Sequence, residues 1–222
     1  MRRIGLLMVL TGVLGLVGCL DPTTGTPPAR TAAVPAYRSS VSTVTAADLG
    51  SSWRAGCPVG PSQLRRVRVD YWGYDGTVHR GDIIVRSTVA DDVADAFGEL
   101  YAARFQVNRI HPVSRYGSDD DESMAANNTS AFNCRAVTGG TGWSEHAYGT
   151  AIDINPIQNP YVTRSGTVLP PAGKPYADRD VKVPGMIHRK GVVRSAFAAI
   201  GWEWGGDWVN TKDYQHLSLT GR

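Results

Sequence analysis

The chain has 222 residues, of which 42% are hydrophobic and 19% are charged, enough for one globular domain and a tail. Its formal net charge is only +3, and Arg2 and Arg3 contribute two of those charges from a segment that we expect to be removed. A chain so nearly neutral gives no reason to propose nucleic acid as a partner.

Residues 1–18 have the pattern of a secretory signal peptide. A positively charged start is followed by an apolar run, residues 4–17, that is too short for a comfortable membrane span. The run ends in Leu-Val-Gly-Cys, which resembles a bacterial lipoprotein box and places Cys19 at the cleavage point. We therefore expect an exported protein of the cell envelope, anchored by a lipid on Cys19 to the outer face of the membrane. An ordinary signal peptide that happens to contain a cysteine is the alternative.

Residues 19–47 are expected to form a flexible tether between this anchor and the domain. They are rich in proline, threonine, serine and alanine and contain few large apolar side chains. Such a segment cannot bury enough surface to offset the entropy of ordering it. The folded domain would then comprise residues 48–222.

The only other cysteines are Cys57 and Cys134. An even pair in an exported chain favours a disulfide. Zinc binding by this pair lacks the support of a CxxC spacing, and two free buried thiols are the remaining alternative.

The domain begins with segments of clear periodicity. Leu64–Trp72 alternates as a strand does, and residues 82–87 form a second strand, so the two predict a hairpin with a long glycine-containing loop. Apolar residues at helical spacing predict a helix over residues 89–105 with Thr88 as its N-cap, and another over residues 192–200.

Three further segments flank the predicted site. Ser118 precedes four acidic residues, a pattern typical of a helix start with the serine as cap. Residues 155–184, rich in proline and glycine, are expected to be a long ordered loop beside the cleft. Segment 202–208 contains three tryptophans that could bind a sugar or peptide, although core packing is favoured for at least one of them: Trp202, Trp204 and Trp208.

The most informative stretch is Ser-Glu-His-Ala-Tyr-Gly-Thr-Ala-Ile-Asp-Ile, residues 144–154. It places His146 and Asp153 seven residues apart, with Gly149 between them to allow a sharp turn. The alternation after the glycine predicts a strand, so the imidazole and the carboxylate can reach one point in space. Both groups are good ligands for zinc.

A third ligand is expected from the other end of the chain. His216 would complete a set of two histidines and one carboxylate, which leaves the fourth tetrahedral position for water. Asp213, three residues earlier, can lie close to the metal without binding it. A carboxylate there can accept a proton from the bound water.

The run Ser-x-His-x-x-x-x-x-x-Asp and the downstream Asp-x-x-His together resemble the zinc D-Ala-D-Ala carboxypeptidase and L-Ala-D-Glu endopeptidase family, which belongs to a wider group with lysostaphin and the hedgehog signalling domain. The similarity covers roughly residues 109–219. The resemblance implies zinc bound by His146, Asp153 and His216, with Asp213 as general base. Aspartate at the base position leans toward the endopeptidase branch.

The resemblance also implies two residues that contact substrate. Arg115 is the counterpart of an arginine that stabilises the developing oxyanion, although the order here is Ser-Arg-Tyr rather than Tyr-Arg-Ser. A salt bridge is the alternative for that arginine. Ser144 could bind a substrate carboxylate or cap a turn.

These observations predict an α+β fold in which a central antiparallel sheet carries the zinc site and helices pack on one face. The expected function is zinc-dependent hydrolysis of peptidoglycan stem peptides, as a D-Ala-D-Ala carboxypeptidase or an L-Ala-D-Glu endopeptidase. Two alternatives stay open. One is a non-catalytic, zinc-stabilised cell-wall-binding domain of the same fold. The other is a purely structural lipoprotein in which the three predicted ligands only hydrogen-bond.

Overall fold

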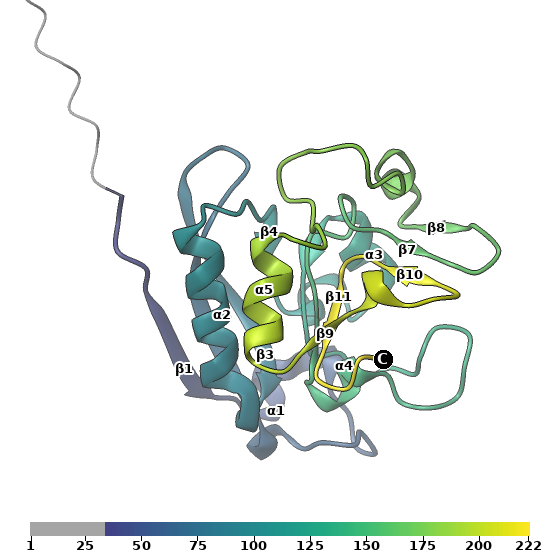
Figure 1. Cartoon of the computed structure of the whole chain (residues 1–222). Coiled ribbons are helices and arrows are strands. Elements are labelled where there is room, and N and C mark those ends of the chain that lie inside the picture. Colours follow the sequence, from purple (N-terminus) through teal and green to yellow (C-terminus); the bar gives the residue numbers. More distant parts are fainter. Residues whose placement is uncertain (1–33) are drawn as a thin grey trace, which may run out of the picture. The chain divides into compact units, whose positions relative to one another are not determined.

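A computed structural model describes residues 34–222, of which Pro35–Arg222 form one compact unit (Figure 1). The unit contains helices and mainly antiparallel strands, so the predicted α+β class is confirmed. The single central sheet is not found. Instead, the described residues form three three-stranded sheets and one two-stranded sheet. The predicted signal peptide, Cys19 and residues 19–33 of the predicted tether lie outside the described residues.

The first sheet has the order β1-β2-β3 and is antiparallel throughout. β2 (Leu64–Trp72) has the predicted bounds, whereas β3 (Val78–Arg86) begins earlier than expected. The predicted long loop is therefore a tight turn. It is closed by a hydrogen bond from the Gly73 N–H to the Thr77 carbonyl (2.8 Å) and by the Asp75 carboxylate, which accepts from the Thr77 N–H at 3.0 Å.

The predicted tether overlaps this sheet. β1 (Ser39–Thr43) pairs with β2, and α1 (Ala46–Leu49) follows with Thr45 in a capping box. Residues 35–47 of the predicted tether thus belong to the compact unit Pro35–Arg222. All five side chains of β1 are exposed. The strand is held by main-chain hydrogen bonds, and its composition carries no apolar signal for burial.

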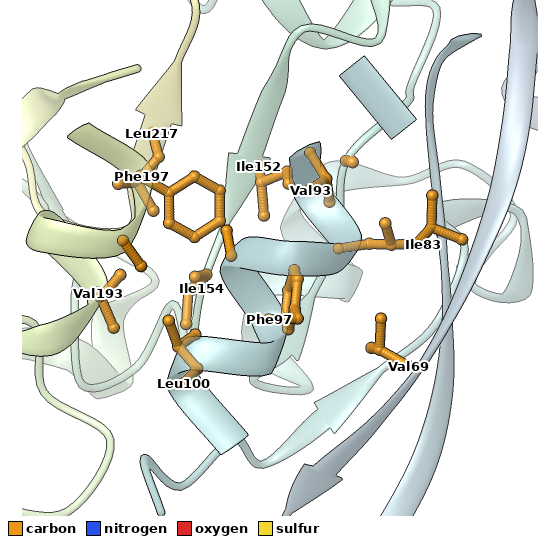
Figure 2. Packing of buried hydrophobic residues seen from close by; sticks show 14 of the residues in the cluster. Val69, Ile83, Val93, Phe97, Leu100, Ile152, Ile154, Val193, Phe197 and Leu217 are labelled. Atoms are coloured by element: carbon orange, nitrogen blue, oxygen red, sulfur yellow. The ribbon is translucent and has the colours of Figure 1, made fainter. Parts of the chain in front are cut away.

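Two helices cover one side of the core. α2 (Ala90–Ala102) and α5 (Val192–Ala199) lie side by side, and their inner faces meet at an edge-to-face contact between Phe97 and Phe197, with ring centroids 6.2 Å apart (Figures 1 and 2). Thr88 is not the N-cap of α2, because a 3-10 turn, η3 (Ser87–Val89), runs directly into the helix.

The second sheet, of order β6-β11-β9, packs against these helices. Its strands are β6 (Ala151–Asp153), β9 (Glu203–Trp204) and β11 (His216–Ser218). Ile152 and Leu217 are paired across β6 and β11 and point into the core (Figure 2). The adjacent pair, Asp153 and His216, therefore lies on the opposite face, since side chains alternate along a strand.

The remaining elements are short. β4 (Arg109–Ile110) and β5 (Asn128–Thr129) pair in parallel, and a third antiparallel sheet has the order β10-β7-β8. Its strands are β7 (Tyr161–Val162), β8 (Val168–Leu169) and β10 (Lys212–Asp213). The short helices are α3 (Asp120–Ala125), α4 (Glu145–Tyr148), η1 (Gly50–Ser52), η2 (Pro61–Gln63), η4 (Val113–Tyr116), η5 (Pro171–Tyr176) and η6 (Gly205–Asp207).

Asp119, not Ser118, caps α3, with its carboxylate accepting from the Glu122 N–H at 3.0 Å. Ser118 has a positive φ of 67°, and its hydroxyl instead contacts those of Ser51 and Ser52 at 2.8 and 2.9 Å. The serine therefore joins the segment before α3 to η1.

The segment between β6 and α5, predicted as one long loop, contains β7, β8 and η5, and its remaining parts are held mainly through main-chain groups. Arg179 donates to the carbonyls of Gln158 and Ile187 and to the side-chain oxygen of Asn159. Its guanidinium also lies 4.4 Å from the ring centroid of Tyr214, just after β10. These contacts attach the loop to the strand segment that leads to His216.

The predicted disulfide is present. Cys57 and Cys134 are bonded with their Cα atoms 5.9 Å apart, which joins the start of the domain to the segment before α4. Cys134 belongs to a smaller hydrophobic cluster that includes Leu64 and Phe132, and the partly buried Cys57 packs against it. No helix within residues 34–222 is both long enough and apolar enough to cross a membrane.

Candidate metal centre and cavity

Three buried side chains converge on the face of β6 and β11 that points away from the core. One potential ligand atom from each of His146, Asp153 and His216 lies within 4.8 Å of the others. His146 Nε2 is 3.1 Å from Asp153 Oδ2 and 3.3 Å from His216 Nδ1, and Asp153 Oδ1 is 3.1 Å from His216 Nδ1. The structure thus brings the three predicted ligands together from three separate elements.

The geometry of α4 positions His146. Ser144 is its N-cap and accepts a hydrogen bond from the His146 N–H at 3.3 Å. Gly149 ends the helix at a φ of 70°, and a Cβ there would lie 2.7 Å from the backbone nitrogen of Arg86. Glycine is required for both reasons, and the turn that it makes leads directly into β6.

Hydrogen bonds to carbonyl oxygens fix both imidazole rings. His146 Nδ1 lies 2.7 Å from the Ala131 carbonyl, and His216 Nε2 lies 2.8 Å from the Arg222 carbonyl. A carbonyl can only accept, so each of these nitrogens carries the proton when the ring is neutral. His146 Nε2 and His216 Nδ1 then present lone pairs to Asp153, an arrangement common among metal-binding histidines. Two imidazoles and one carboxylate are a donor set that suits zinc.

The charges of the cluster favour a cation beside Asp153. Burial opposes ionisation of that carboxyl, but the charge of His146 and hydrogen bonds from both histidines outweigh it and lower the pKa of Asp153 far below its usual range. Burial lowers the pKa of His216, while the hydrogen bond and charge of Asp153 raise it to about 9. In the metal-free protein a proton on His216 compensates the negative charge of Asp153. A bound metal ion would supply that positive charge instead of the proton.

Asp213 faces the same region from β10, where it pairs with Tyr161 of β7. Burial, followed by the negative charge of Asp153, raises the pKa of Asp213 to about 7. Its Oδ1 is buried and has no hydrogen-bond partner among the described residues. The strand approaches η6 closely, because a Cβ on Gly205 would lie 2.6 Å from the Asp213 carbonyl oxygen.

A cavity of about 630 Å³ opens over these groups. The three clustered residues, Asp213 and Ser144 all line it. Arg115 does not: it lies on η4, is exposed, and its guanidinium contacts the ring of His111 at 3.4 Å. The structure therefore does not bring the predicted oxyanion-binding arginine to the site.

Arg135 lines the cavity instead. It forms an ion pair with Asp120 (Nη2 to Oδ2, 2.9 Å), and its positive charge lowers the pKa of Asp213, opposing the effect of burial. Arg135 was not among the site residues predicted from the sequence. Its position directly after Cys134, which the disulfide holds, was the available signal.

The tryptophans divide between core and cavity. Trp202 and Trp204 are 3% and 6% exposed and belong to the main core, so the preference for core packing is confirmed for these two. Trp208 lines the cavity with its ring centroid 5.5 Å from that of His216. Trp143, which the sequence analysis did not single out, is 38% exposed and also lines the cavity.

One family model matches the part of the chain that contains these residues. Residues 138–219 match the family model described as D-alanyl-D-alanine carboxypeptidase, which supports the resemblance inferred from the two motifs. The matched segment contains all three clustered residues and Asp213, whereas the first sheet and α2 lie outside it. No curated protein and no solved structure gives a significant match to the chain.

Proposed function

We propose that this chain, whose residues 138–219 carry the D-alanyl-D-alanine carboxypeptidase family match, is a zinc-dependent peptidase that cuts peptidoglycan stem peptides. The observation that carries the proposal is the buried cluster of His146, Asp153 and His216 beside Asp213 in one cavity. A hydrogen-bonded structural cluster needs neither the cavity nor an additional buried carboxyl group.

The chain's own groups suit the metal. His146 through Nε2, His216 through Nδ1 and Asp153 through its carboxylate would hold the ion, and the Ala131 and Arg222 carbonyls orient the two rings. A bound zinc ion supplies a Lewis acid and a water of lowered pKa.

Asp213 is the proposed general base. Burial raises the pKa of Asp213 to about 7 in the metal-free protein, and a bound cation would favour the ionised form that accepts a proton. Its buried Oδ1, with no partner among the described residues, is free to accept that proton from the attacking water. The same group would then donate the proton to the leaving amine.

Arg135 takes the oxyanion-stabilising role that the sequence analysis gave to Arg115. Its ion pair with Asp120 holds the guanidinium at the cavity wall, and a fixed cation is worth most where negative charge develops. Ser144 accepts the His146 N–H and so keeps its hydroxyl proton for donation to a substrate carboxylate.

Two substrate bonds fit the proposal. The matched family description names carboxypeptidase, whereas aspartate at position 213 leans toward the L-Ala-D-Glu endopeptidases. We further propose that the protein is exported and anchored by lipid on Cys19, which would place the domain next to its substrate. Defined muropeptides, with the products weighed by mass spectrometry, identify the bond that is cut.

The metal is tested with a matched pair of histidine variants. His216→Ala should lose zinc and hydrolysis together, because it removes a ligand. His79→Ala should keep both, since His79 is exposed on β3 and bonded to Asp75. Wild-type protein that binds zinc but releases no product from any muropeptide would favour the non-catalytic wall-binding alternative. Wild-type protein without metal would favour the structural one.

A further inference from the structure

We infer that Arg86 binds a free carboxylate of the substrate, carried by the residue on the leaving-group side of the scissile bond. The inference rests on the proposed peptidase function and assigns a recognition role to a residue outside the matched segment.

Arg86 is the last residue of β3 and lies beside the end of α4. Its backbone N–H donates to the Gly149 carbonyl at 2.8 Å, and the residue lines the cavity. The first sheet therefore contributes one cationic residue to a site otherwise built from later parts of the chain.

The side chain of Arg86 lacks the partners that comparable arginines have. Within residues 34–222 the half-buried arginines are Arg65, Arg66, Arg86, Arg135, Arg179 and Arg194. Each of the others forms an ion pair with a carboxylate or donates hydrogen bonds from its guanidinium. Among these six arginines of residues 34–222, only the guanidinium of Arg86 has neither an ion pair nor a hydrogen bond. None of its side-chain nitrogens is among the fully buried atoms that lack a hydrogen-bond partner, so the guanidinium is open to the cavity and able to bind an anion there.

The nearby acidic group does not supply that partner. Glu145 lines the same cavity, but its Oε2 accepts from the Thr150 hydroxyl at 2.7 Å, and it forms no ion pair with Arg86. Arg222 also lines the cavity and forms no ion pair among the described residues. An anion that binds Arg86 would therefore displace no ion pair of that side chain within residues 34–222.

The position of Arg86 suits a group close to the bond that is cut. Thr150 follows Gly149 and precedes β6, whose last residue is Asp153. Three residues of strand span about 10 Å, a distance that one substrate residue and an arginine side chain can cover together. Both candidate bonds have a carboxylate on the leaving residue, next to the nitrogen of the scissile bond: the terminal carboxylate of D-Ala-D-Ala, or the α-carboxylate of the glutamate whose amine L-Ala acylates. The planar guanidinium suits either, because it can bind a carboxylate with two parallel hydrogen bonds.

The test compares acid and amide forms of both substrates. Stem peptides ending in D-Ala-D-Ala, and peptides with the L-Ala-D-Glu bond, are prepared with this carboxylate either free or amidated. The wild type should prefer the free acid by about ten- to a hundred-fold in kcat/KM, the range for loss of a charged hydrogen bond. Arg86→Gln should abolish that preference mainly through KM, and Arg86→Lys should keep part of it. Arg164→Gln is the control, because Arg164 is exposed and does not line the cavity.

Each other result contradicts a specific statement. An Arg86→Gln variant that keeps the wild-type preference for the acid would show that Arg86 does not read the carboxylate. A fall in kcat on acid and amide alike, with a lowered thermal midpoint, would assign Arg86 to the support of α4 instead. Wild-type protein that cuts none of the four peptides would overturn the proposed function, and that failure is seen before any Arg86 variant is compared.

Discussion

Asparagine in place of Asp213 keeps the size of the side chain but cannot accept a proton, and we expect this one change to separate chemistry from architecture. The three metal-binding candidates are untouched, so zinc content should stay at the wild-type level. Hydrolysis should fall by roughly two to four orders of magnitude, the usual scale of general acid–base assistance. Zinc content and turnover are to be measured on the same preparations.

The raised pKa of Asp213 also predicts that Asp213→Asn stabilises the metal-free protein, although the same substitution lowers activity. Its rise from 3.8 to about 7 spans about three units, which corresponds to roughly 4 kcal/mol at most against the folded metal-free protein. The folded state binds more protons than the unfolded state across this window, so stability falls as the pH rises through it. Metal-free Asp213→Asn should therefore unfold at higher denaturant concentration than the wild type at pH 8, and the difference should shrink toward pH 4.

The pH dependence of activity has the opposite sign. Catalysis needs the Asp213 carboxylate, so kcat/KM should fall as the pH drops. A bound cation favours the ionised form, and the midpoint should lie below about 7. The reasoning is refuted if Asp213→Asn loses zinc in step with activity, or if it is less stable than the wild type at pH 8. Either result would make Asp213 a ligand or a structural support.

Three other changes have defined outcomes. Replacing Cys57 and Cys134 together by serine should lower the free energy of unfolding by about 4 kcal/mol, since the bond closes a separation of 77 residues, as urea titration can measure. Burial raises the pKa of Asp70, but hydrogen bonds and charge from two arginines outweigh burial and lower it. The ionised carboxylate should therefore stabilise the fold above pH 4, and this stabilisation should be lost as the pH falls further. Asp70→Asn should remove that acid-sensitive part of the free energy of unfolding, as denaturant titration at several pH values can measure. Cys19→Ala should release the protein from membranes without detergent or leave an unprocessed precursor, and normal membrane retention of that variant would contradict the lipid anchor.

The elements best predicted from the sequence are those whose own side chains enter the core. β2 alternates because one face packs against α2, and α5 has helical periodicity because Val193 and Phe197 are buried. β1 gave no such signal, because its side chains are all exposed and only its backbone pairs with β2. Hydrogen bonds of the main chain leave no trace in composition.

The residues of the candidate site also differ in how far the sequence could predict them. His146 and Asp153 were predictable because a short turn joins them, and His216 because an aspartate precedes it at a fixed spacing. Arg86 reaches the cavity from a strand that ends long before α4 begins, a neighbourhood set by tertiary packing alone. Arg115 was assigned from a local pattern whose residues the structure places outside the cavity.

Arg179 holds the segment between β6 and α5 without contacting the side chains of the β7–β8 hairpin. Most of its contacts are with main-chain carbonyls, the side chain of Asn159 and the ring of Tyr214, and none is with a side chain of the β7–β8 hairpin. The path of the loop is therefore largely independent of what that hairpin displays. Tyr161 and Leu169 of the hairpin line the cavity, so exchanging these two side chains should change the cavity wall without removing any of the contacts of Arg179.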